Sequence, residues 1–260
     1  MRDSSTAEAC FAWLTPFGGL HGGLKGGHMP RKTRALLFDL DDTLYPQCRF
    51  IFSGFAAVAR YLEDRSGVDR GRAFRLLMTA FNNDRGHELD RLVEQLELTE
   101  SVASLVAVIR DHTPLLTLEP AAVRTLRELR RSWQLAIVTN GVPAIQTAKV
   151  AALGLDDLVD TVVYATEHGS GAGKPEPAPF LEALRRLDVP AAQAIFVGDD
   201  EVADICGATE CGMRAIQTLQ WKRAASALIS NRAAAHVHRI EDVPAVADSL
   251  LSRRRTHYAA

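Results

Sequence analysis

Short apolar runs recur along the chain from residue 31 onward and alternate with stretches whose apolar residues repeat at helical spacing. The runs predict buried strands at Ala35–Phe38, Leu135–Val138, Thr161–Tyr164, Ala194–Val197 and Met213–Ile216. The stretches between them predict helices near residues 120–131, 143–153, 176–187 and 201–210. This alternation predicts an α/β fold with an open parallel sheet flanked by helices, in which ligands bind beyond the carboxyl ends of the strands.

Residues 46–114 interrupt this alternation, because they contain no clear strand. Their apolar residues instead follow helical periodicity over Phe50–Leu62, Arg72–Phe81, Leu89–Leu96 and Val102–Ile109. We therefore expect an all-helical cap over residues 46–114, inserted between two core segments, residues 31–45 and 115–260. Since the insertion opens directly behind the first strand, we expect it to cover the carboxyl edge of the sheet.

The first thirty residues carry three glycine pairs and little apolar surface to bury. We expect residues 1–30 to form a flexible, disordered extension. Met29 directly precedes the first predicted strand, so we expect the native chain to start there. The apolar run Ala9–Leu14 is too short for the core of a signal peptide.

Composition narrows the possible partners. With 47% hydrophobic and 24% charged residues, the chain is typical of a soluble globular protein. The formal charge of −2 offers no net field that would attract a nucleic acid polymer or an anionic membrane, so we expect neither as a partner, and any anionic ligand must be bound by local groups. Four cysteines without a C-x-x-C pair, and no export signal, predict a cytoplasmic protein. The oligomeric state does not follow from the sequence.

Carboxylates gather where the first predicted strand ends. Asp39, Asp41 and Asp42 directly follow Ala35–Phe38, and their mutual repulsion is costly unless a cation binds. Asp39 and Asp41 lie two residues apart, so in an extended chain both side chains point to one side. One could then attack a substrate while the other handles a proton. A solvated acidic turn is the alternative for this segment alone.

Polar groups also follow the other predicted strands. Thr139 and Asn140 end the second strand and could donate hydrogen bonds to an oxyanion, although such residues are also common in turns. Lys174 follows a glycine-rich loop, but Pro175 stands where a nucleotide-binding P-loop requires Ser or Thr.

A second acidic cluster, which includes Asp199 and Asp204, follows the fourth predicted strand. Hard carboxylate oxygens favour Mg²⁺ as the bound cation. The helix macrodipole alone could account for this cluster, but not for the matching one at Asp39.

In this order the motifs resemble those of the haloacid dehalogenase superfamily. They are DLDDTL at residues 39–44, VTNG at 138–141, GKPEP at 173–177 and GDDEVADICGA at 198–208. The resemblance spans residues 34–250 and implies the superfamily's Rossmann-like core. The long gap between the first and second motifs is similar to that of members with a helical cap. The segments DTLYP and TNG further resemble the pyrimidine 5′-nucleotidase-like phosphatases.

The resemblance also implies catalytic roles. Asp39 would attack phosphorus to form an aspartyl phosphate, and Asp41 would protonate the leaving oxygen and then activate water. Thr139, the backbone near Asn140, and Lys174 would bind the phosphate oxygens.

The same resemblance implies a metal site. Mg²⁺ would be held by Asp39, the backbone carbonyl of Asp41, and Asp199, with Asp204 contributing directly or through another ligand.

These residues predict a Mg²⁺-dependent phosphatase that acts on a small soluble phosphomonoester, either a nucleoside monophosphate or a sugar phosphate. Members that displace halide have no second aspartate at the position of Asp41, so dehalogenation is not expected. A phosphosugar mutase with the same aspartyl phosphate is the main alternative, and a non-catalytic phospholigand-binding protein is a second. Residues of the cap that could select the substrate are Arg49, Asn82, Asn83, Arg85 and His87.

Overall fold

The computed structural model describes residues 32–222 and 229–252. Within them a six-stranded sheet has the order β3-β2-β1-β4-β5-β6, and every neighbouring pair is parallel. The strands are β1 (Ala35–Phe38), β2 (Gln134–Thr139), β3 (Thr161–Tyr164), β4 (Ala194–Gly198), β5 (Arg214–Thr218) and β6 (Ala235–Val237). The predicted α/β fold with a parallel sheet is confirmed.

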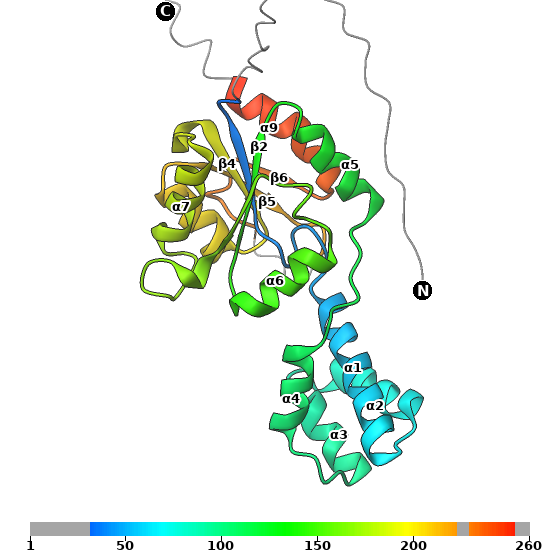
Figure 1. Cartoon of the computed structure of the whole chain (residues 1–260). Helices are drawn as coiled ribbons and strands as arrows, with labels where there is room; N and C mark the ends of the chain where they lie inside the picture. The colour runs from blue at the N-terminus through cyan, green and yellow to red at the C-terminus, as the bar shows by residue number, and fades with distance from the viewer. Residues whose placement is uncertain (1–31, 223–228, 253–260) are drawn as a thin grey trace, which may run out of the picture. The chain divides into compact units, whose positions relative to one another are not determined.

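Helices cover both faces of this sheet (Figure 1). Leu36 and Phe38 point into a core closed by α5 (Pro120–Leu129), α6 (Pro143–Ala152) and α9 (Val243–Ser252). Their neighbours Ala35 and Leu37 point into the opposite core, which is closed mainly by α7 (Pro177–Leu187) and α8 (Gly207–Glu210). Strands buried on both faces have uninterrupted apolar sequences, which explains why short apolar runs predicted them. Four shorter turns complete the described core: η1 (Ala165–Glu167), η2 (Ala191–Gln193), η3 (Glu201–Cys206) and η4 (Ile240–Asp242).

The strand order reverses at β1, and this reversal places the polar strand ends together. From β1 the chain continues to β2 and β3 on one side, whereas β4, β5 and β6 lie on the other. Phe38 is paired in register with Ile137 of β2 and Val197 of β4, and Asp39 N–H donates to the Val197 carbonyl at 2.9 Å. The residues that follow these strands therefore leave the sheet at one edge, at a topological switch point.

Residues between β1 and α5 form the four helices predicted there. They are α1 (Cys48–Ser66), α2 (Arg70–Asn83), α3 (Glu88–Leu96) and α4 (Val102–Asp111). These helices bury a hydrophobic cluster of their own, which includes Val58, Leu62, Leu77 and Leu105. Phe81 lies edge-on to Phe52 at 5.1 Å between ring centroids. The segment therefore has a separate core, as a helical insertion requires.

The structure also departs from the predicted elements. The fifth strand is shifted to Arg214–Thr218, and the sequence did not predict β6 or α9. The predicted helix at residues 201–210 begins as the π-helical turn η3 and only then continues as α8. The predicted extension at residues 1–30 lies outside the described residues. In the part of the chain that is described, no helix combines the length and apolar character needed to cross a membrane.

Candidate active site

A tight turn follows Asp41, just after β1, and brings the chain back to Tyr45. Asp42 N–H donates to the Tyr45 carbonyl at 2.9 Å, and Asp42 adopts a left-handed conformation with φ of 55°. The Asp42 carboxylate accepts a hydrogen bond from Gln47 N–H at 2.8 Å, which ties the turn to the start of α1. The turn brings Tyr45 beside Asp41, so Asp39 and Asp41 have different partners.

Lys174 is buried between two carboxylates. Its ammonium lies 2.7 Å from Asp39 Oδ1 and 2.7 Å from Asp204 Oδ1, and its side chain is 2% exposed. Burial alone would lower the pKa of Lys174, but the charges of Asp204 and Asp39 outweigh it and raise that pKa above its ordinary value. Burial raises the pKa of Asp39 to about 8, and the charges of Asp204 and Asp41 add to the increase while Lys174 opposes it. A single ammonium therefore does not neutralise this group of carboxylates.

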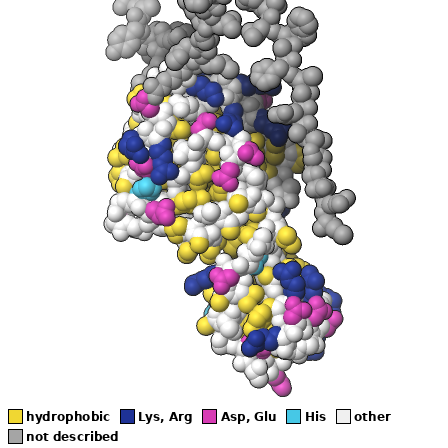
Figure 2. Space-filling model, viewed as in Figure 1, with side chains coloured by type: hydrophobic (Ala, Val, Ile, Leu, Met, Phe, Trp, Pro, Cys, Tyr) yellow, Lys and Arg dark blue, Asp and Glu magenta, His cyan; other side chains and the backbone are white. Residues whose placement is uncertain are grey.

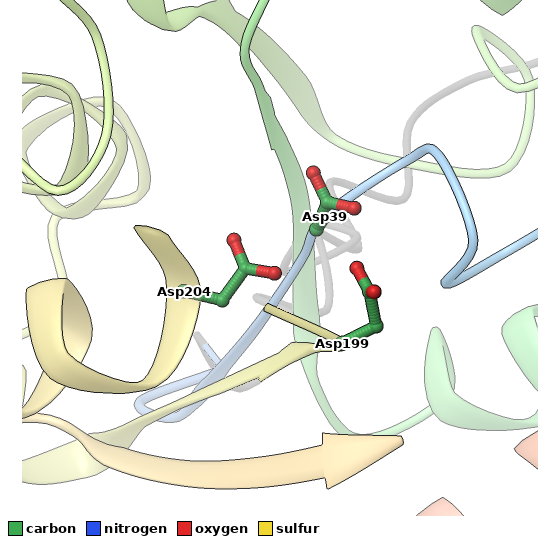
Figure 3. A group of neighbouring side chains, drawn as sticks. All are labelled: Asp39, Asp199 and Asp204. Carbon is green, nitrogen blue, oxygen red and sulfur yellow. The ribbon is translucent and has the colours of Figure 1, made fainter. Parts of the chain in front are cut away.

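Three carboxylates converge at the edge of the sheet, as Figure 3 shows. Ligand oxygens of Asp39, Asp199 and Asp204 all lie within 4.8 Å of one another. Burial and then Asp204 raise the pKa of Asp199 to about 7, although Lys222 lies 3.5 Å from its carboxylate and opposes the change. Clustered, incompletely neutralised carboxylate oxygens are the donor set that Mg²⁺ prefers, so these residues fit that ion.

The turn that carries Asp204 is built around Asp200 and Gly198. The Asp200 carboxylate accepts hydrogen bonds from Val202 N–H at 2.8 Å and Ala203 N–H at 2.7 Å, which caps η3. Asp204 Oδ2 in turn accepts from Asp200 N–H at 3.0 Å. A Cβ atom at Gly198 would lie 2.3 Å from Asp204 Oδ2, so glycine there permits the close approach of Asp204 to the end of β4.

The end of β2 supplies Thr139 and Asn140. The Thr139 hydroxyl is buried and accepts a hydrogen bond from Gln146 Nε2 at 2.5 Å. Asn140 accepts from Lys174 N–H at 2.8 Å and donates to the Lys174 carbonyl at 2.9 Å, across a cis Lys174–Pro175 peptide. Gly173, with φ of 79°, allows the close approach of the Asn140 amide. The Asn140 side chain therefore orients the Lys174 loop. The contact between phosphate and the backbone near Asn140 stays a prediction.

All the predicted catalytic, phosphate-binding and metal-binding residues line one cavity of about 280 Å³, whereas none of the five residues proposed to select the substrate does. Its lining consists of Asp39, Asp41, Asp42, Gln47, Thr139, Asn140, Lys174, Asp199, Asp200, Ala203 and Asp204. Asp41 borders the cavity, but its carboxylate does not belong to the Asp39–Asp199–Asp204 group. The predicted contact of Asp41 with a metal, through its backbone carbonyl, stays a prediction.

The sequence did not reveal the partners of Asp41. Lys149 Nζ lies 2.8 Å from each oxygen of the Asp41 carboxylate, Gln146 Nε2 donates to Oδ2 at 3.0 Å, and the Tyr45 hydroxyl donates to Oδ1. Gln146 and Lys149 lie three residues apart on α6, and both are buried. The available signal in the sequence was two polar residues at helical spacing within a predicted helix, but nothing in the sequence linked them to Asp41.

The residues proposed to select the substrate differ in their surroundings. Arg49 pairs with Glu119 at 3.1 Å, and His87 lies 3.9 Å from Asp90. Arg85 stacks over the Phe81 ring at 4.4 Å. Burial raises the pKa of Asp42, while the hydrogen bond from Gln47 and the charge of Arg85 oppose the increase.

Asn82 and Asn83 are exposed at the end of α2. The Asn82 amide donates to the Met78 carbonyl at 3.0 Å within that helix. This bond gives no indication of a ligand contact.

Comparisons with known proteins identify the family of this chain. A family model of haloacid dehalogenase-like hydrolases matches residues 33–212. A glyceraldehyde 3-phosphate phosphatase of Methanothermobacter thermautotrophicus is 33% identical over 70% of this chain and 84% of its own. A ribulose-1,5-bisphosphate 5-phosphatase of Halopiger xanaduensis is 33% identical over 70% of this chain and 83% of its own. The crystal structure of a 2-haloacid dehalogenase from Pseudomonas syringae superimposes with a TM-score of 0.56 at 27% identity, covering 84% of this chain and 99% of that one.

Proposed function

Because the chain belongs to the haloacid dehalogenase-like hydrolase family, we propose that it is a Mg²⁺-dependent phosphatase acting through an aspartyl phosphate on Asp39. The supporting observation is the pair of carboxylates, Asp39 and Asp41, that border one cavity beside the buried Lys174. The family includes dehalogenases, but a second carboxylate beside the nucleophile suits an oxygen leaving group, which needs a proton. The predicted likeness to pyrimidine 5′-nucleotidase-like phosphatases stays a prediction.

In the first step the Asp39 carboxylate attacks phosphorus, and the bond from phosphorus to the ester oxygen breaks. Asp41 gives its proton to that departing oxygen, which leaves as an alcohol. Thr139 and Lys174 donate hydrogen bonds to the phosphoryl oxygens and stabilise their charge during transfer. Lys174 also lowers the repulsion between Asp39 and the phosphate.

In the second step the Asp41 carboxylate takes a proton from water as the water oxygen attacks phosphorus. The bond from phosphorus to Asp39 breaks, which releases inorganic phosphate and restores both the Asp39 carboxylate and the protonated Asp41. Asp39, Asp199 and Asp204 would hold Mg²⁺, and the bound ion supplies positive charge that offsets the phosphate and the carboxylates.

The relatives named above suggest the substrate class. They are phosphatases of a three-carbon and a five-carbon sugar phosphate. We propose that this chain likewise acts on a small sugar phosphate. The helices α1–α4, within residues 46–114, would act as a cap that excludes larger esters. On the face shown in Figure 2, acidic and basic side chains are interspersed, which suits a small ligand better than a nucleic acid polymer. The cytoplasmic location predicted from the cysteines is part of this proposal.

Release of inorganic phosphate tests the proposal. The panel comprises glyceraldehyde 3-phosphate, ribulose 1,5-bisphosphate, glucose 1-phosphate and nucleoside monophosphates, each with Mg²⁺ or EDTA. We expect Mg²⁺-dependent release that is lost in Asp39→Asn, while the exposed control Asp248→Asn retains it. Equal release by Asp39→Asn would contradict the proposed nucleophile. Isomerisation of glucose 1-phosphate without phosphate release would favour a mutase, and binding without turnover would favour a binding protein.

A further inference from the structure

We propose that Lys149 is a positioning residue, which holds the Asp41 carboxylate in the orientation from which Asp41 exchanges its proton. Gln146 and Tyr45 assist it. This inference rests on the proposed function, because it assigns a task to Lys149 only if Asp41 serves as the acid and base.

The contacts of Asp41 fix its carboxylate plane. Lys149 Nζ is 2.8 Å from both oxygens, so the ammonium straddles the carboxylate. Gln146 adds a donor to Oδ2 at 3.0 Å, and the Tyr45 hydroxyl adds one to Oδ1. Each oxygen thus lies within hydrogen-bond distance of two donors, and one of them, the Lys149 ammonium, is shared between both oxygens. Donors from two separate elements, α6 and the turn after β1, leave the side chain little freedom to rotate.

Lys149 and Gln146 contact Asp41 from outside the cavity. Asp41 borders the cavity with a side chain that is 19% exposed, whereas the Lys149 side chain is 5% exposed and does not line the cavity. Gln146 is also buried and absent from the lining. A substrate in the cavity would contact Asp41 but not Lys149, so Lys149 acts through Asp41.

Stability alone gives no reason for a lysine here. Burying an ammonium and a carboxylate costs desolvation energy that their attraction often fails to recover, and apolar replacements are often neutral or stabilising. The buried face of α6 consists of Gln146, Lys149 and Val150. Two polar side chains on a face that ordinarily carries apolar residues indicate that the buried polar pair serves the site.

The network also extends beyond Asp41. Gln146 Nε2 contacts the Thr139 hydroxyl at 2.5 Å, so one amide orients both the proposed acid and a proposed phosphate ligand. On its other side, the Lys149 ammonium lies 4.5 Å from the centroid of the Phe50 ring, which belongs to α1. The ring shields the ammonium and adds a cation–π contact. Lys149 is therefore held in one position between the Phe50 ring and the Asp41 carboxylate.

Leaving-group dependence tests this role, because a proton donor matters only when the leaving oxygen needs a proton. We would compare kcat/KM of wild type and Lys149→Met for glycerol 3-phosphate and for 4-nitrophenyl phosphate, whose leaving group departs as a stable anion. Misplacing a general acid should cost up to ~100-fold on the alkyl ester. On the nitrophenyl ester we expect a loss below about 3-fold. Lys149→Arg, which keeps the charge and two donors, should restore part of the alkyl-ester activity.

A double-mutant cycle separates positioning from a structural role. If Lys149 acts through Asp41, adding Lys149→Met to Asp41→Asn should cause no further loss of kcat/KM. The matched control is Val150→Ala, which perturbs the adjacent buried position of α6 and should lower Tm without changing the ratio between the two substrates. Tyr45→Phe removes only a hydroxyl. It should lower kcat/KM more on the alkyl ester than on the nitrophenyl ester, but by less than Lys149→Met does. This variant tests the proposal even if Lys149→Met does not fold.

Equal losses on both esters, or a full additional loss in the Asp41→Asn background, would show that Lys149 only supports the fold. Failure of the proposed function looks different. In that case wild type would release no phosphate from any ester, or Asp39→Asn would release as much as wild type.

Discussion

Gly198→Ala should test how closely β4 and η3 must approach one another. The new Cβ would lie 2.3 Å from Asp204 Oδ2 and 2.5 Å from Asp204 Cβ and Cγ. Ordinary van der Waals contact begins at 3.4 Å, so Asp204 Oδ2 must move away by about 1.1 Å. The whole side chain must move with it, because Asp204 Cβ and Cγ are also too close to the new atom. Hydrogen bonds to nitrogen span only about 2.7–3.2 Å, so Asp204 cannot keep its bonds to both Lys174 and Asp200.

The expected cost combines overpacking with a broken buried ion pair. Overpacking costs about 1–3 kcal/mol, and breaking a buried pair costs about 3–5 kcal/mol. Since these overlap, we expect the free energy of unfolding to fall by about 3–5 kcal/mol. For a chain of this size that corresponds to a Tm about 6–20 °C lower. A misplacement of about 1 Å near the reacting groups should also reduce kcat/KM about 100-fold.

Thermal or urea unfolding and phosphate release would both be measured, with Gly71→Ala as the control. Gly71 lies in the first turn of α2, where a Cβ would meet the flexible Arg75 guanidinium at 3.0 Å and Asp69 Oδ1 at an ordinary contact distance of 3.5 Å. That substitution should be neutral or stabilise by up to about 1 kcal/mol, because alanine favours a helix. If Gly198→Ala were as stable and active as wild type, the close packing of Asp204 on β4 would not matter to the site.

Three other predictions follow from the same site. Lys174→Met should abolish most phosphate release, about 100-fold or more in kcat/KM, because it removes the donor between Asp39 and Asp204, and retained activity would contradict its role. Without metal, the free energy of unfolding should fall as pH rises from about 4 to about 8. Folding raises the pKa of Asp39 from 3.8 to about 8 and that of Asp199 to about 7. In this pH range the folded chain therefore keeps protons that the unfolded chain has released. Mg²⁺ should then raise Tm more at pH 8 than at pH 5, and urea unfolding in EDTA with equal midpoints at both pH values would refute this. Arg85→Ala should raise KM for sugar phosphates about 10-fold with kcat little changed, if its exposed guanidinium contacts the bound ester; an unchanged KM in initial-rate assays would exclude that contact.

The core strands were predictable because a strand buried on both faces has a continuous apolar sequence. Ala35–Phe38 and Thr161–Tyr164 match the predicted bounds residue for residue. The strand β6 could not be found this way, because Ala235–Val237 is short, and His236 in its middle is exposed. It joins the sheet through its pairing with β5, which is a contact formed only in the folded chain.

The proposed catalytic groups were predictable for a related reason. Parallel strands that end in step place their following residues at one edge, so Asp39, Thr139 and Asp199 could be inferred to meet before any distance was known. The sequence by itself therefore determined the fold class, the helical insertion and seven of the eleven residues that border the cavity.

Only the tertiary structure decided which of these residues touch one another. Lys149 contacts Asp41 across 108 positions of the chain, and Gln146 contacts it across 105. Helical spacing shows that Gln146 and Lys149 share a face of α6, but not that this face packs behind the turn after β1. The same holds for Gly198, whose missing side chain has meaning only because η3 brings Asp204 against it. Such contacts depend on how distant elements pack, and that information lies in no local pattern.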